Sequence, residues 1–176
     1  MYYDLLKKYA TSDELLHVLL THSEQVADMA VDILHRHPEL GADESFVREA
    51  AMLHDIGIVR CNAPAIHCFG AEPYIRHGLI GSEILLAEGL PRHARVAERH
   101  TGTGITIHGI REQNLPLPLR DYSPETIEEQ IICYADKFFS KTKLGLTKTT
   151  DQALASLWKF GDESTRRFRH WHEMFA

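Results

Sequence analysis

Apolar residues recur at helical spacing along most of the chain. Between about residues 12 and 37 they stand three or four positions apart, which is the spacing of one buried helix face. The positions are Leu15, Leu19, Val26, Met29 and Ile33. Thr11 and Glu14 form a possible capping box at the start of this segment, and Pro38 and Gly41 follow its end. Alternation of apolar and polar residues, which would indicate strands, is almost absent.

Proline, glycine and capping residues divide the rest of the chain into further segments. Pro91 and Pro124 suit the first turn of a helix, and Asp151 suits a helix cap. The ranges that we expect to be helical are about 43–57, 73–89, 91–102, 124–142 and 151–172. Residues 57–72 and 102–123 are expected to be loops, and a connection as long as the second is often functional. The pattern therefore predicts a compact all-α domain of about six to eight helices.

Composition and charge narrow the class of protein. The chain has 176 residues, 44% of them hydrophobic, which suits one domain with its own core. A formal net charge of -6 argues against a general binder of nucleic acids or membranes, and no apolar run reaches the roughly 20 residues of a membrane span. No signal peptide is visible at the start of the chain, and nothing in the sequence predicts an oligomeric state.

The three cysteines also favour a cytoplasmic protein, because an odd number of them in a chain of this size suits a reducing compartment. Cys61 and Cys68, with His67 between them, resemble half of a zinc site. No second pair of ligands completes such a site, which favours free thiols.

The chain has 12 histidines, and several fall where a helix should be apolar. His22 continues the apolar stripe of the first segment, and Asp55 directly follows an inward-facing histidine. The inward-facing ionisable residues are His22, His54, His77, His100 and Asp136, and His93 lies on the same face as His100. Any one of them is most simply a hydrogen-bonded core residue, because burial without a partner costs several kcal/mol.

Five helices that each turn an ionisable residue inward favour a shared explanation. If the faces meet, four imidazoles and two carboxylates converge, and a metal ion satisfies them together. A nitrogen and oxygen set without thiolates suits Fe, Mn, Zn or Ni. Six ligands exceed the needs of one tetrahedral ion, which favours two divalent ions that share a carboxylate.

The run Ala-Ala-Met-Leu-His54-Asp55-Ile-Gly57 resembles the signature of the HD superfamily of metal-dependent phosphohydrolases, in its HDIG form. Together with the other inward-facing residues it gives an ordered H…HD…H…H…D set. The resemblance covers about residues 22–141, which would form the metal-binding core of a single domain over 1–176, followed by a C-terminal helix over about 151–172.

The resemblance implies a ligand set and a reaction. His22, His54 and Asp136 would hold one ion, His77 and His100 a second, and Asp55 would bridge them. Such proteins cleave a phosphomonoester, a nucleotide phosphoanhydride or a phosphodiester, and a metal-activated hydroxide would be the nucleophile. The substrate partner would thus be a small phosphorylated molecule such as a nucleotide.

Nearby cations are the candidate contacts to phosphate. Lys137 and Lys141 lie just past Asp136, one helical turn apart, and can flank the site. We expect Lys137 and Arg76 to act with Asp55 in catalysis. The expected substrate-binding residues are Arg99, Thr101, Thr103 and Lys141.

Two other interpretations use the same residues. One is a regulatory or ligand-binding HD domain without turnover. The other is a mononuclear enzyme that uses only His22, His54, Asp55 and Asp136. Cyclic di-GMP is disfavoured as the substrate, because Thr101 follows His100 where the enzymes specific for it have a second histidine.

Overall fold

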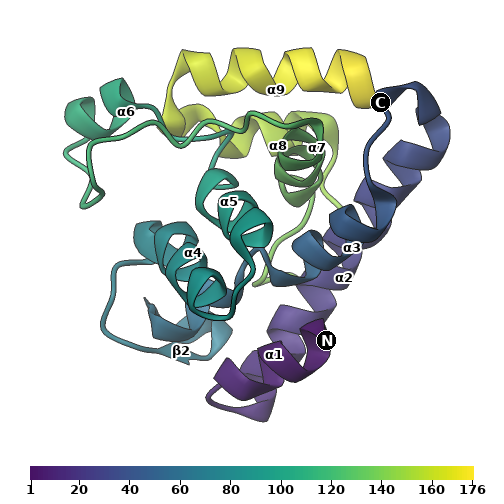
Figure 1. Cartoon of the computed structure of the whole chain (residues 1–176). Helices are drawn as coiled ribbons and strands as arrows, with labels where there is room; N and C mark the ends of the chain where they lie inside the picture. The colour runs from purple at the N-terminus through teal and green to yellow at the C-terminus, as the bar shows by residue number, and fades with distance from the viewer.

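Nine α-helices, five short 3-10 segments and one two-stranded sheet make up the fold (Figure 1), in a computed structural model that describes residues 1–176. The α-helices are α1 (Tyr2–Tyr9), α2 (Asp13–Arg36), α3 (Glu44–Leu53), α4 (His77–Ala87), α5 (Pro91–Arg99), α6 (Ile107–Glu112), α7 (Ile127–Asp136), α8 (Thr150–Ser156) and α9 (Asp162–Phe175). The 3-10 segments are η1 (Pro38–Leu40), η2 (Ile56–Arg60), η3 (Pro64–Ile66), η4 (Tyr74–Arg76) and η5 (Trp158–Phe160). Strands β1 (Asn62–Ala63) and β2 (Cys68–Phe69) pair antiparallel. The all-α prediction is confirmed.

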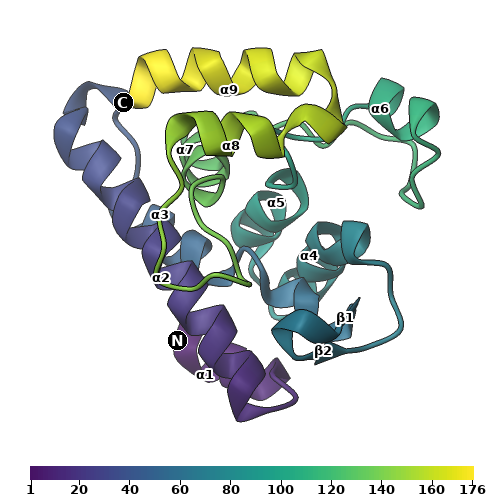
Figure 2. The same ribbon diagram turned by 180° about the vertical axis from the view of Figure 1, so that it is seen from behind.

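The long helix α2 packs against α3 and α7, and α4 lies along α5 (Figure 1). Helix α9 runs across one end of the bundle above α7 and α8, while α6 lies at its edge (Figure 2). Apolar side chains from α1 to α9 form one large buried cluster, and a smaller one of Leu79, Ile105, Ile110 and Tyr122 anchors the connection between α5 and α7. None of the helices combines the length and the apolar character needed to cross a membrane.

Side-chain caps set where several helices begin. Ser12, rather than the expected Thr11, caps α2 by accepting a hydrogen bond from the Leu15 amide at 3.1 Å. Asp43, where the expected helix begins, caps α3 in the same way. Thr126 forms a full capping box with α7, so that this helix begins three residues after Pro124.

Helix ends and loops differ most from the sequence prediction. The segment expected as one helix over 151–172 is two helices, because Gly161, with φ of +89°, separates α8 from α9. Helix α7 ends at Asp136 instead of continuing to 142. Helices α1 and α6 were not expected, which raises the number of α-helices to nine.

Gly57 permits a close approach between η2 and α4. A Cβ atom on Gly57 would lie 1.9 Å from the His77 carbonyl oxygen and 2.4 Å from the Gly81 nitrogen. No side chain fits in that space, so only glycine lets η2 pack directly on α4. This packing brings Asp55, just before η2, next to the first residue of α4.

Candidate metal centre

Six buried ionisable side chains converge where five helices meet. His22 lies within α2, whereas the other five lie at helix ends. His54 and Asp55 follow α3, His77 opens α4, His100 follows α5 and Asp136 closes α7. The sequence prediction placed these residues on inward helix faces; the structure brings them together mainly through helix termini.

One group of donors joins α2, α3 and α7. The Nε2 atom of His22 lies 3.0 Å from Oδ1 of Asp136 and 3.1 Å from Oδ2 of Asp55. The Nε2 atom of His54 lies 3.2 Å from the same Asp55 oxygen and 3.4 Å from Oδ1 of Asp136. One donor atom from each of these four side chains lies within 4.8 Å of all the others, which is close enough for them to share an ion.

A second group joins α4 and α5 to the same aspartate. The Nε2 atoms of His77 and His100 lie 3.0 Å apart. Oδ1 of Asp55 lies 3.5 Å from His77 Nε2 and 3.2 Å from His100 Nε2. Asp55 therefore faces the first group with one carboxylate oxygen and the second group with the other.

Backbone carbonyls orient three of the histidines. Each donates a hydrogen bond from Nδ1 to the carbonyl three residues earlier: His54 to Ala51, His77 to Tyr74 at 2.6 Å and His100 to Ala97 at 2.7 Å. In the neutral form of each imidazole the ring proton is thereby held on Nδ1, and Nε2 is left to present its lone pair to the cluster. This is the arrangement that metal-binding histidines require.

The donor set fits divalent metal ions. Oδ1 of Asp55 and Nε2 of His54 are buried and have no hydrogen-bond partner, whereas Oδ2 of Asp55 is contacted by the ammonium group of Lys141. Such atoms cost free energy unless a cation satisfies them. Two imidazole nitrogens bound about 2.1 Å from one ion lie about 3 Å apart when their bonds are at right angles, which matches His77 and His100. The set holds nitrogen and oxygen but no thiolate, as Fe, Mn, Zn and Ni accept.

The electrostatics of the cluster favour ionised carboxylates. Burial opposes ionisation of Asp55, yet Lys141 and His54 hold the pKa of its carboxyl well below the usual range. Burial likewise opposes ionisation of Asp136, whose pKa is held well below its usual range by Lys137 and His22. Both side chains are therefore anionic at neutral pH, as ligation requires.

The imidazoles differ between the two groups. Burial disfavours the charged form of His54, but Asp55 and Asp136 outweigh it and raise the pKa of this histidine to about 9. Burial and the neighbouring His100 lower the pKa of His77 to about 3, so His77 is neutral. The second group thus presents uncharged imidazoles, the form that binds metal.

Two lysines lie directly on the carboxylates. The ammonium group of Lys137 is 2.6 Å from Oδ2 of Asp136 and donates to the His100 carbonyl at 2.9 Å. The ammonium group of Lys141 is 2.7 Å from Oδ2 of Asp55. Both residues were expected beside the site, and the structure brings them there.

A cavity of about 410 Å³ opens beside the cluster, and Asp136 is part of its wall. Tyr74, whose ring stacks on His77 at 4.5 Å, lines another side. The cavity contains four lysines: Lys137, Lys141, Lys148 and Lys159. The last two were missed by the sequence analysis, because no motif marks them and they come from segments beyond the recognised pattern.

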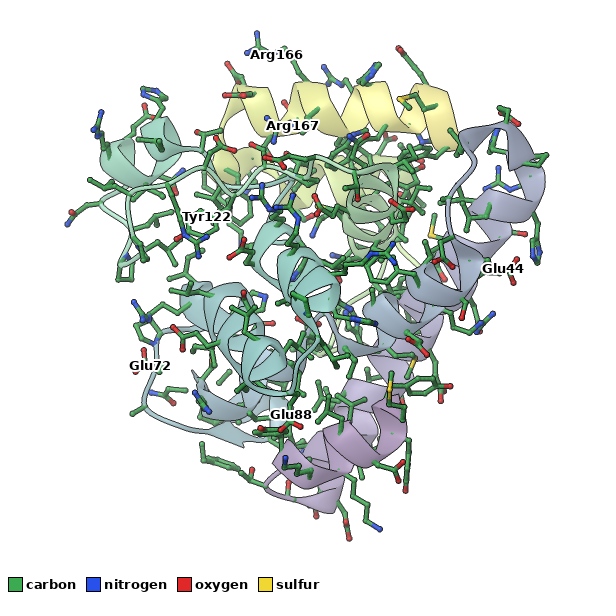
Figure 3. The ribbon with its side chains drawn as sticks, in the orientation of Figure 1. Glu44, Glu72, Glu88, Tyr122, Arg166 and Arg167 are labelled. Atoms are coloured by element: carbon green, nitrogen blue, oxygen red, sulfur yellow. The ribbon has the colours of Figure 1, made fainter.

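The expected arginines bind elsewhere. Arg76 donates to the Pro116 carbonyl at 2.8 Å and forms an ion pair at 2.9 Å with Glu72, which lies at the edge of the molecule in Figure 3. Arg99 is buried and donates to the Ser123 carbonyl at 2.5 Å. Neither arginine lines the cavity.

The two threonines also lie outside the cavity wall. The Thr103 hydroxyl is fully buried and lies 2.9 Å from the Ser164 hydroxyl on α9. Thr101 packs near α4, where a Cβ atom on Gly78 would lie 3.3 Å from its hydroxyl oxygen. The structure therefore places both threonines between helices.

Comparison with known proteins defines the class. An all-α bundle that buries this set of histidines and aspartates is the architecture of an HD domain, and the family model described as "HD domain" matches residues 19–140. The chain belongs to the HD domain family.

The chain is also about one-third identical to three proteins, two of which are named as methyltransferases. The chain is 35% identical over 141 residues to a tRNA (cytidine(56)-2′-O)-methyltransferase of Picrophilus torridus, and 36% identical over 141 residues to the protein of that name from Thermoplasma volcanium. Each match covers 80% of this chain but only 36% of the relative, so the chain spans about a third of their length. It is 36% identical to the uncharacterized protein MJ0778 of Methanocaldococcus jannaschii, over 79% of this chain and 73% of that protein. No solved structure matches the chain.

Proposed function

We propose that the protein is a metal-dependent phosphohydrolase with a dinuclear centre. The observation that carries the proposal is the bridging position of Asp55. Its two carboxylate oxygens face two separate donor groups, and a cavity lined by lysines lies beside them. When bound, two divalent ions of Fe, Mn, Zn or Ni would activate water and stabilise charge on a phosphoryl group. The proposed substrate is a phosphomonoester, a nucleotide phosphoanhydride or a phosphodiester.

Two lysines and two arginines are proposed to contact the phosphate or to position the site. Lys137 and Lys141 contact the carboxylates and line the cavity, where their ammonium groups can meet phosphoryl oxygens as negative charge develops. Lys137 also orients Asp136 and the segment that carries His100. Arg76 and Arg99 hold the surrounding connections in place through their own partners.

Residues 1–176 are proposed to act as one domain in a reducing, cytoplasmic compartment. Leu157 and Phe160, which follow the family match, complete the cavity wall and tie the C-terminal segment to the site. The free thiols of all three cysteines are consistent with that compartment.

The test is turnover with defined metals. Protein loaded with Mn, Fe, Zn or Ni is assayed on a panel of phosphate esters and nucleotides, alongside a His54→Ala, Asp55→Ala double variant. His93→Ala is the matched control, because His93 is a buried histidine that contacts Glu49 outside the cluster. We expect the double variant to lose turnover by at least about a thousandfold, since the nucleophile's ions are lost, and the control to keep it.

Retained turnover in the double variant would refute the mechanism. Absence of product across the whole panel, with metal bound, would refute the hydrolase and favour a ligand-binding HD domain without turnover.

RNA is the second candidate ligand, and the names of two relatives favour it. A net charge of -6 argues for a local rather than a general contact with RNA. Binding of a tRNA transcript is measured at low and high salt, together with cleavage of its phosphodiester bonds. Tight binding without cleavage or nucleotide turnover would favour a tRNA-binding role; no binding at low salt would exclude it.

A further inference from the structure

Three lysines of the cavity lie outside the family match, which ends at residue 140. Lys141 follows the match directly and pairs with Asp55, whereas Lys148 and Lys159 come later in the chain. They belong to the C-terminal part of the chain and have no role in the proposed metal centre.

The charges of the four lysines are not equally balanced. Lys137 and Lys141 are paired with the two buried aspartates. Lys148 and Lys159 form no ion pair, and Asp136 is the only acidic residue in the cavity wall. The cavity thus carries surplus positive charge in a chain whose net charge is -6. Surplus cations gathered in one concave site favour a ligand with several negative charges.

Backbone hydrogen bonds fix the position of the loop that carries Lys148. The Lys148 amide donates to the Phe138 carbonyl at 2.8 Å, and Thr147 pairs with Phe139, so the loop after α7 folds back beside Lys137. Burial and the neighbouring cations lower the pKa of Lys148, although Asp136 opposes this, which is consistent with lysines that share one space.

Lys159 approaches from a different element. It belongs to η5, and its neighbour Phe160 packs against Gly102, where a Cβ atom would lie only 3.0 Å from the Phe160 ring. Because Gly102, two positions after His100, has no side chain, η5 can pack against it, and Lys159 and Phe160 then line the cavity. Two different segments, the loop after α7 and η5, therefore bring lysines without ion pairs to one pocket.

We infer that Lys148 and Lys159 form a subsite for a second phosphate group, so that the substrate carries a phosphoanhydride chain, as a nucleoside diphosphate does. This inference rests on the proposed function, which assigns the phosphate beside Lys137 and Lys141 to the metal centre. A volume of about 410 Å³ lies within the range of small-molecule sites. A single phosphate beside the metal centre would contact Lys137 and Lys141 and would leave Lys148 and Lys159 without an anionic partner.

The test compares two stable probes, orthophosphate and methylenediphosphonate, which carry one and two phosphorus groups. Calorimetry on metal-loaded protein gives both dissociation constants, and elemental analysis after titration verifies that the metal is retained. We expect methylenediphosphonate to bind at least about tenfold tighter than orthophosphate, because charge-assisted hydrogen bonds are among the stronger ones.

A Lys148→Gln, Lys159→Gln double variant is expected to reduce that preference to about twofold and to leave orthophosphate binding within about twofold, since only the second phosphate loses its partners. Lys143→Gln is the matched control, because Lys143 is an exposed lysine of the same segment that lies outside the cavity wall. Lys159→Gln alone, at an exposed position, is expected to remove part of the preference and guards against a folding defect in the double variant.

An unchanged preference in the variants, or an equal loss for both probes, would overturn the subsite. A preference that depends on the two lysines, in a protein without turnover on any phosphate ester, would refute the proposed hydrolase and leave the diphosphate site standing. Turnover of monophosphates without any such preference would do the reverse.

Discussion

The Nε2 atoms of His77 and His100 face each other at 3.0 Å, and each ring has its proton on the opposite side, donated to a backbone carbonyl. Two lone pairs therefore point at one another inside the protein. Burial lowers the pKa of both imidazoles, so a proton does not relieve this contact at neutral pH. A shared cation relieves it, which makes this pair the most specific indication of a second metal position.

We therefore predict that His77→Ala and His100→Ala each reduce the metal content from two ions per chain to one. The first donor group keeps His22, His54 and Asp136 in both variants. Elemental analysis of purified protein measures the stoichiometry, with His93→Ala as the control that keeps both ions. One ion in the unchanged protein, undiminished in both variants, would show a mononuclear centre.

Removal of metal is expected to destabilise the fold. An ion present at about 100 times its dissociation constant stabilises the native state by about 2.7 kcal/mol. For a domain of this size that corresponds to a fall in Tm of roughly 5–10 °C. Differential scanning calorimetry with and without a chelator measures the change, and added Mn or Zn should restore the original Tm. An unchanged Tm would argue against a metal that is bound in the native state.

Gly57→Ala should disrupt the packing of η2 on α4. The new methyl group would lie 1.9 Å from the His77 carbonyl oxygen, so backbone must move, and overpacking of this kind costs about 1–3 kcal/mol or more. Urea unfolding gives the loss of free energy, and metal analysis reports the displacement of His77.

Gly109→Ala is the control for that substitution. A Cβ atom there meets only the Thr106 hydroxyl at 3.5 Å, within α6. Its stability should stay unchanged or rise by up to about 1 kcal/mol. Equal effects of the two substitutions would contradict the packing argument.

The three thiols should be unreactive in the folded protein. Burial raises the pKa of Cys61 and Cys68 to about 11 and that of Cys133 to about 12. At most about one thiol in a thousand is then ionised at pH 8, and the thiolate is the reactive form. Titration with Ellman's reagent should detect three thiols in denaturant and react far more slowly without it. Reactivity should rise with pH, and fast labelling of the native protein at pH 8 would contradict the burial.

The sequence predicted the ligand-bearing helices well where local signals define them. The apolar stripe of α2 and the start of α3 near Asp43 are set by neighbouring residues, so the local sequence is enough to find them. The end of α7 was predicted six residues too late, because the chain turns after Asp136 to place Lys137 against the His100 carbonyl. That contact joins distant segments and leaves no local pattern.

The same distinction applies to the site. An ordered set of histidines and aspartates indicated which residues meet, and all six do. Arg76 was expected at the site, but it pairs with its i,i+4 neighbour Glu72 and donates to the distant Pro116 carbonyl, a contact that leaves no local pattern. Lys148 and Lys159 reach the cavity through a loop and a 3-10 turn, whose paths depend on tertiary packing such as that of Phe160 on Gly102.

Because helix ends meet at the cluster, the metal content should affect how fast the protein is degraded in a cell. Ions held there would connect α2, α3, α4, α5 and α7 at one point. A chain that lacks them would open more often, and proteases act on such open states. We expect the amount of this protein in the cell, and not only its proposed catalytic rate, to rise and fall with the supply of metal.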